Sequence, residues 1–227
     1  MEDDAGESIA ALLERGKSSY IVRLTDGRCY GPFKESVLVE CLVKRGRLWT
    51  QALEQELAYA QQLATAKESA VFYLSHASHT EAEVRRYLKV KKRIGSKEIH
   101  ETVQWLRDSG WLDDEALGER IVQRFRENPG SESERSLKAR LMRRGIDSNT
   151  VASVLAGETL DEYPGALKLG RKRLDLIDYK LSRSLEGDYG SRIPRDSERR
   201  RLLMAYLARK GYAQGTVMRV IQTLLDH

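Results

Sequence analysis

The sequence lacks most of the residues that interrupt helices and most of those that build chemical sites. Its 4 prolines in 227 residues place few obligatory breaks in helices. Its two cysteines, Cys29 and Cys41, have no Cys-x-x-Cys partner and no histidine cluster beside them. This favours two reduced thiols over a disulfide or a metal site. Aromatic residues make up only 7% and charged residues 32%, a mixture typical of helices with one apolar and one charged face.

Motifs that would indicate membrane insertion or catalysis are also absent. No apolar run approaches the roughly 18 residues needed to cross a bilayer, and the chain begins Met-Glu-Asp-Asp, which is unlike a signal peptide. The sequence has no glycine-rich phosphate loop and no Ser-His-Asp or Cys-His arrangement. We therefore expect a soluble, cytoplasmic protein that is not an enzyme and that holds no cofactor and no metal.

The charge of the chain is unevenly distributed. The formal net charge is +5, with 8 basic and 10 acidic side chains in residues 1–66 against 31 and 24 in residues 67–227. The basic character therefore belongs to the second, longer part. It makes an anionic partner plausible for that part.

The beginning of the chain predicts a small β element followed by helices. Asp26-Gly27 is a strong two-residue turn signal, and strand-like residues on both sides of it predict a hairpin over 20–33. A short helix over 37–44 follows, and Thr50 is a plausible cap for a long helix. A lone hairpin is marginal in water, so we expect it to dock on these helices.

A repeated pattern occupies the rest of the chain. Three lines of apolar residues superimpose, apart from one extra residue in the first line, and each predicts a helix, a tight turn and a second helix. The lines are Val84, Leu88, Ile94, Ile99 and Val103; Leu137, Leu141, Ile146, Val151 and Leu155; and Leu203, Leu207, Tyr212, Val217 and Ile221. A glycine stands at the turn of the second and third lines (Gly145, Gly211), where the first has Arg93.

A further predicted helix precedes each line, so the fold class is mainly α, with three tandem three-helix repeats in an elongated, solenoid-like protein. A small β-hairpin extension stands at the N-terminal end. The expected domains are a flexible tail over 1–19, the hairpin with helices over 20–66, and repeats over 67–109, 110–158 and 159–227. The third repeat carries an inserted loop near 186–194.

The stretch Gly110-Trp-Leu-Asp-Asp114 joins the first and second repeats. Gly110 suits the end of one helix, and Asp113 or Asp114 suits the cap of the next. Trp111 and Leu112 are interpreted as apolar plugs that face the core. The two aspartates also resemble paired catalytic carboxylates, but acid–base chemistry or metal binding needs further converging ligands. A structural junction is therefore the favoured interpretation.

These residues carry a resemblance to a known family. The Gly-Trp-Leu-Asp-Asp junction, the arginine-rich helix after it and the repeated turn with a basic residue and glycine resemble the RecX family of recombination regulators. The resemblance covers about residues 67–227, although Leu117-Gly118 stands where the family usually has Phe-Ala. It implies a protein that binds the RecA filament on single-stranded DNA and lowers its recombination, ATPase and coprotease activities, in DNA repair and the SOS response.

Basic residues recur near the turn of each repeat, and we call this set the basic stripe. The sequence predicts that it binds an anionic partner, because clusters of cations without matching acids repel one another. For any single residue, a solvated helix end is the simpler interpretation. The stripe consists of Arg85, Arg86, Lys89, Lys91, Lys92 and Arg93; Arg135, Lys138, Arg140, Arg143 and Arg144; and Arg199, Arg200, Arg201, Arg209 and Lys210.

Two other functions remain open. A basic helical module could bind nucleic acid directly, and single-stranded DNA is a candidate partner in its own right. A solenoid scaffold could instead hold an unrelated protein, in which case an exposed apolar stripe is expected rather than a basic one. In each case we expect a monomer.

Overall fold

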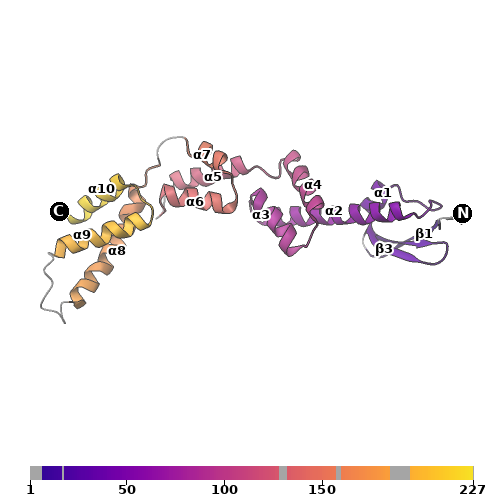
Figure 1. Cartoon of the computed structure of the whole chain (residues 1–227), viewed down its shortest axis with the longest axis horizontal. Coiled ribbons are helices and arrows are strands. Elements are labelled where there is room, and N and C mark those ends of the chain that lie inside the picture. Colours follow the sequence, from indigo (N-terminus) through magenta and orange to yellow (C-terminus); the bar gives the residue numbers. More distant parts are fainter. Residues whose placement is uncertain (1–6, 17, 128–131, 157–159, 185–194, 227) are drawn as a thin grey trace. The chain divides into compact units, whose positions relative to one another are not determined.

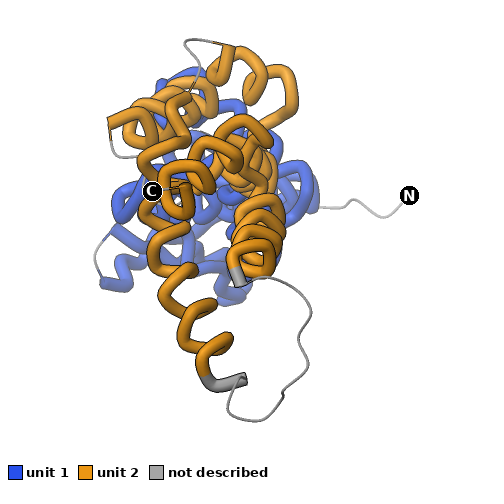
Figure 2. The backbone as a smooth tube through the Cα atoms, turned by 90° about the vertical axis from the view of Figure 1, so that its left-hand side faces the viewer, with its two compact units in different colours: residues 1–112 blue, residues 113–227 orange. Residues whose placement is uncertain are grey.

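The computed structural model describes residues 7–16, 18–127, 132–156, 160–184 and 195–226. Most of them are helical, and the one sheet among them is small and antiparallel (Figure 1). The predicted mainly α class is thereby confirmed. The chain divides into two compact units, residues 1–112 and 113–227 (Figure 2). The end-to-end arrangement of the repeats stays a prediction.

The N-terminal sheet has three strands, whereas the sequence predicted two. The predicted hairpin is formed by β2 (Ser19–Leu24) and β3 (Cys29–Lys34). A further strand, β1 (Ile9–Glu14), pairs antiparallel with β2, so the expected flexible tail over 1–19 is wrong for these residues. The physical reason is Ile9, which is 1% exposed and belongs to the hydrophobic core of this sheet.

Two helices complete this N-terminal part. The first, α1 (Glu35–Glu40), is shorter than the predicted helix. The second, α2 (Gln51–His76), begins where predicted, because the Leu53 amide donates to the hydroxyl of Thr50 at 3.2 Å. It runs without a break across the predicted domain boundary between residues 66 and 67. Its start packs in the core of the sheet, and Ala70 packs in the core of the first repeat.

The first repeat consists of the end of α2 and three further segments. They are α3 (Glu81–Arg86), the π-helical turn η1 (Tyr87–Lys91) and α4 (Ser96–Asp108). Thr80 and Glu83 form a reciprocal capping box at the start of α3. The buried core contains Val84, Leu88, Ile99 and Val103 of the first apolar line, joined by Ala70, Leu106 and Leu112, and the partly buried Ile94 packs against it.

The second and third repeats form the second compact unit. Each has three helices around a separate core, which contains the predicted apolar line of that repeat. The helices are α5 (Asp114–Glu127), α6 (Glu134–Arg144) and α7 (Ser148–Leu155), then α8 (Tyr163–Ser184), α9 (Arg195–Arg209) and α10 (Gln214–Leu225). The predicted loop at 186–194 lies outside the described residues.

The turns of these two repeats share one hydrogen-bonded geometry. Gly145 and Gly211 have φ values of +94° and +88°, which a residue without a side chain adopts most easily. The amide of the next residue, Ile146 or Tyr212, donates to the carbonyl of Leu141 or Leu207, in each case at 3.3 Å. This is the closure expected of a helix that ends in a left-handed residue. The predicted glycine-ended turns are therefore confirmed.

Candidate partner-binding site

The turn of the first repeat carries its cations in a different geometry. The extra residue of this repeat is absorbed by η1, in which the Lys92 amide donates to the Tyr87 carbonyl five residues earlier, at 3.3 Å. Ile94 then donates to the Leu88 carbonyl at 3.1 Å, the counterpart of the bonds that close the other two turns. Arg93 occupies the place of Gly145 and Gly211, with a φ of +55°. The helix turn is thus wider, and an arginine takes the glycine position.

Five of the six basic-stripe residues of this turn are exposed to solvent. Among the residues that the structure describes, none of the five makes an ion pair. The sixth, Arg85, is partly buried and its Nε lies 2.6 Å from Glu81. Glu81 also pairs with Arg107 of α4. The exposed five are Arg86, Lys89, Lys91, Lys92 and Arg93.

The expectation that the cations have no matching acids is wrong for Arg140 of the second repeat. Arg140 reaches both carboxylate oxygens of Glu132, at 3.2 and 2.9 Å. Glu132 precedes α6 and was missed because it lies eight residues upstream, beyond the reach of helical spacing rules. Arg135, Lys138 and Arg143 are exposed, while Arg144 is partly buried.

The same expectation fails at three arginines of the third repeat. Arg199 forms a forked pair with Asp178 of α8, at 2.7 and 2.8 Å, and this pairing raises the pKa of its guanidinium. Arg200 pairs with Asp226, and Arg201 pairs with Glu198. These acids come from other helices or from the neighbouring turn, so their contribution was not visible along the apolar line. Arg209 and Lys210 are exposed.

Aromatic rings next to the basic turns were missed by the sequence analysis. The Tyr87 ring stacks on Tyr73 of α2, with 4.2 Å between ring centroids and 6° between planes, and Tyr73 also stacks on His79. Tyr206 holds the same position in the third apolar line, directly before the second core leucine. A lysine from the turn approaches each of these two tyrosine rings: Lys92 is 5.7 Å from the Tyr87 centroid and Lys210 is 5.8 Å from the Tyr206 centroid. Comparison of the lines at this position would have found them.

The junction between the first two repeats shows the expected helix end and helix cap. Gly110 has a φ of +72° and closes α4, and the Asp113 carboxylate accepts from the Ala116 amide at 2.8 Å as the cap of α5. Leu112 is 6% exposed and lies in the core of the first repeat. Trp111 is 50% exposed, so its interpretation as a plug facing the core is wrong. The amide of Trp111 is fixed by the Leu106 carbonyl, which directs this residue out of the core.

A second joint lies inside the second unit, between its two repeats. The Ser133 hydroxyl, fully buried, donates to the Lys210 carbonyl at 2.8 Å and also caps α6. Glu162, 8% exposed, accepts from the amides of Glu134 and Ala213, which belong to different repeats. A side chain at Gly211 would meet the Ser133 hydroxyl at 2.9 Å. The joint therefore holds the turn of the third repeat against the start of α6.

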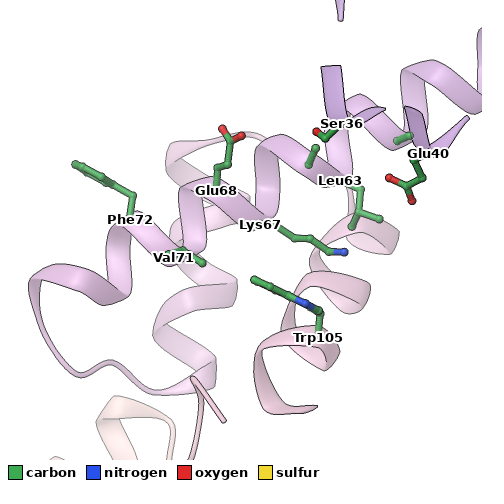
Figure 3. Close-up of a pocket in the computed structure, with 10 residues that line it drawn as sticks. Ser36, Glu40, Leu63, Lys67, Glu68, Val71, Phe72 and Trp105 are labelled. Carbon is green, nitrogen blue, oxygen red and sulfur yellow. The ribbon is translucent and has the colours of Figure 1, made fainter. Parts of the chain in front are cut away.

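An apolar pocket of about 570 Å³ lies in the first unit, between α1, α2 and α4 (Figure 3). The Lys67 ammonium lies 5.3 Å from the Trp105 ring centroid, and the two side chains point toward each other in the pocket. Phe72, at its end, is 63% exposed. Glu40 and Glu68 also line the pocket, so its charge is mixed and selects neither an anion nor a cation.

Within the described residues, no group of three or more His, Cys, Asp or Glu side chains is placed to hold a metal ion. A search of the same residues for a helix long and apolar enough to span a bilayer finds none.

A family model and several named proteins are similar to parts of this chain. A model described as the first three-helix domain of RecX matches residues 66–106, which include η1 and its cations. Proteins named regulatory protein RecX are similar over longer stretches. That of Lactococcus lactis is 32% identical over 141 residues, 62% of this chain and 48% of that protein. That of Streptococcus mutans is 25% identical over 169 residues, 74% and 64% of the two chains. The chain thus spans less than two thirds of each of these relatives.

Two solved structures share the fold. A crystal structure of a regulatory protein RecX has a TM-score of 0.69 and 19% identity, and the match covers 97% of this chain and 98% of that one. The structure of RecX from Lactobacillus salivarius has a TM-score of 0.55 and 22% identity, over 73% and 97% of the two chains. At these identities the likeness concerns the fold alone.

Proposed function

We propose that the chain, which is similar to proteins of the RecX family, binds the RecA filament on single-stranded DNA and lowers its recombination, ATPase and coprotease activities. In this proposal the protein is a non-enzymatic regulator that acts in the cytoplasm as a monomer, in DNA repair and the SOS response. The support is twofold. The relatives are named regulatory proteins, and the chain offers exposed cations to a nucleoprotein partner rich in phosphate.

The observation that carries the proposal is the set of stripe cations that stay exposed at the turn of every repeat. Ion pairing with Glu81, Glu132 and Asp178 removes some arginines from the original stripe. The remaining exposed members still occur in all three repeats. They are Arg86, Lys89, Lys91, Lys92 and Arg93; Arg135, Lys138 and Arg143; and Arg209 and Lys210.

A charge-reversal variant tests the role of these cations. Lys138→Glu with Arg143→Glu reverses two exposed stripe residues of α6 that make no ion pair among the described residues. The loss of two surface ion pairs costs on the order of 1.4 kcal/mol, so the half-inhibitory concentration is expected to rise about tenfold. The measurement is RecA ATPase activity on single-stranded DNA at increasing concentrations of the protein.

The matched control is Arg23→Glu with Arg45→Glu. These two exposed arginines lie outside the stripe, in the N-terminal part, and their reversal changes the net charge by the same amount. The control is expected to inhibit like the unmodified protein. A wild-type protein without effect on RecA at micromolar concentration would refute the proposed function. Equal loss in both double variants would show that only net charge matters.

A further inference from the structure

The first repeat contains a groove that combines aromatic rings with unpaired cations. It has a volume of about 550 Å³, within the usual range for ligand sites, and opens beside the stacked rings of Tyr73 and Tyr87. Val90, which η1 turns outward, is 64% exposed at its rim. Arg86, Lys91, Lys92 and Glu83 complete the lining.

The charge of this groove is positive. Its one acid, Glu83, is already engaged, because its carboxylate accepts from the Thr80 amide at 3.0 Å and lies 3.2 Å from the His79 ring nitrogen. The cations Arg86, Lys91 and Lys92 are exposed and have no ion pair among the described residues. Lys89 and Arg93 add two more exposed cations from the same turn. An anion would therefore find several partners here at little cost in broken contacts.

The surroundings of the equivalent tyrosine ring differ between the third repeat and the first. Its equivalent ring, Tyr206, has the guanidinium of Arg173 4.8 Å from its centroid, a contact that comes from the first helix of that repeat. In the first repeat the contact from the first helix comes from another aromatic ring, Tyr73. The cation from the first helix is thereby replaced by an aromatic ring, while a lysine from the turn approaches the tyrosine in both repeats. The result is a surface suited to a planar ligand.

The backbone conformation of this turn also distinguishes the first repeat from the other two. The π-helical turn η1 follows α3 and ends this helix, where it accommodates the extra residue of the first repeat. Arg93 holds a left-handed conformation that the other two repeats assign to glycine, and such a conformation is unfavourable for a residue with a side chain. No described contact of the Arg93 side chain offsets it. Backbone strain that no stabilising contact offsets is a reason to look for a functional role of the residue.

We propose that this groove binds single-stranded nucleic acid, with a base stacked on the Tyr87 ring in the place that the Lys92 ammonium now occupies and the adjoining phosphates paired with Arg86, Lys91 and Lys92. Tyr73 supports the Tyr87 ring from behind, because its own two faces are covered by His79 and Tyr87. Stacking on aromatic side chains beside a basic track is how single strands are bound without sequence preference. A duplex keeps its bases inside its own stack and would meet only the cations. An acidic protein segment would likewise leave the aromatic rings unused. Lys92 is exposed and flexible enough to leave the ring for a phosphate.

The inference deepens the proposed function, because single-stranded DNA forms the core of the RecA filament, but it can be tested without RecA. The probe is a fluorescein-labelled oligothymidylate, and binding of the full chain is followed by fluorescence anisotropy at several salt concentrations. Tyr87→Leu removes the ring and keeps an apolar side chain, whereas Tyr87→Phe keeps the ring. We expect about tenfold weaker binding for Tyr87→Leu, the loss of one base–aromatic stack, and near wild-type binding for Tyr87→Phe.

A second variant tests the phosphate contacts. Lys91→Ala with Lys92→Ala lies in an exposed turn and should leave the fold intact, which the three tryptophans of this unit report by fluorescence. Loss of two phosphate contacts is expected to reduce the slope of log K against log salt by about 1.4, or about 0.7 per contact. This readout does not depend on how well Tyr87→Leu folds.

Three results would overturn the inference. The first is equal binding of the oligonucleotide by wild type, Tyr87→Leu and the double lysine variant. The second is duplex DNA binding that Tyr87→Leu weakens as much as it weakens single-strand binding. The third is binding of a polyglutamate peptide, but not of oligothymidylate, to the same residues. If instead the oligonucleotide binds as expected and RecA ATPase activity is unaffected, the groove assignment holds and the proposed function alone fails.

Discussion

Replacement of Arg93 by glycine should stabilise the first unit while it weakens nucleic-acid binding. Arg93 has a φ of +55° at the position where Gly145 and Gly211 end the equivalent helices. Its side chain is exposed and makes no described contact, so its removal breaks nothing in the folded state. The backbone conformation then becomes one that the residue adopts freely.

The size of the effect follows from two opposing contributions. A residue with a side chain in the left-handed region costs roughly 1–2 kcal/mol relative to glycine. Glycine also lowers the free energy of unfolding by roughly 0.5–1 kcal/mol, because it has more conformational freedom to lose on folding. The net stabilisation is about 0.5–1 kcal/mol, which corresponds to about 3–6 °C in Tm for a unit of about a hundred residues.

The assay can be made specific to this unit. All three tryptophans, Trp49, Trp105 and Trp111, precede residue 113, so tryptophan fluorescence reports the unfolding of the first unit. Gly145→Ala is the converse control in the second unit, where a side chain would enter a φ of +94°. It should lower the melting temperature seen by circular dichroism and have less effect on the tryptophan signal.

A lower or unchanged melting temperature for Arg93→Gly would refute this reasoning. It would mean that Arg93 stabilises the turn through contacts that outweigh the backbone cost. A higher melting temperature together with unchanged oligonucleotide binding would confirm the strain and remove it as support for a binding role. The two measurements on one variant therefore separate the energetic from the functional part of the inference.

Two further predictions concern the stability of the fold: its pH dependence at Tyr212, and the different cost of truncating Leu112 and Trp111. Burial and the nearby carboxylate of Glu162 raise the pKa of Tyr212 to about 12, whereas the unfolded value is about 10. The neutral hydroxyl is therefore favoured in the folded state. The stability that it contributes is fully present below pH ~10 and is lost as pH rises toward 12. In urea titrations, Tyr212→Phe should remove part of this alkaline loss, and an unchanged pH dependence would contradict it. Leu112→Ala should cost about 2–3 kcal/mol by the core cavity it leaves, whereas Trp111→Ala should cost under about 1 kcal/mol. Equal losses on thermal unfolding would show that Trp111 is held in the core.

The repeats could be predicted from the sequence because their signals are local. Apolar spacing, the cap at Thr50 and the glycines at the turns each act within a few residues of the chain, and the structure confirms them. The sequence analysis placed a domain boundary between residues 66 and 67, inside the helix α2. Nothing in the composition of this helix shows that it contributes to two cores. Recognising that this helix continues across the predicted boundary would have required knowledge of the tertiary packing.

The remaining errors concern partners that are distant along the chain. Strand β1 is fixed by pairing with β2 and by burial of Ile9, neither of which is visible in the polar stretch around it. Asp178 lies 21 residues before Arg199, in another helix, so the forked pair between them cannot be inferred from charge patterns. Trp111 was misassigned because a large apolar residue beside a helix end is usually buried, and here the turn directs it outward.

Comparison of the three repeats separates the features that the common fold needs from those that are peculiar to the first repeat. All three close their turns with a backbone bond to the second residue of the apolar line, which is Leu88, Leu141 or Leu207, and two of them do so without a π turn or a left-handed arginine. Those two departures occur together in the repeat whose tyrosine is stacked on another ring and in which five of the six stripe cations make no ion pair among the described residues. Stability would be served by removing both departures. Their presence in one turn is therefore best explained by a ligand that uses the rings and the charges at the same time.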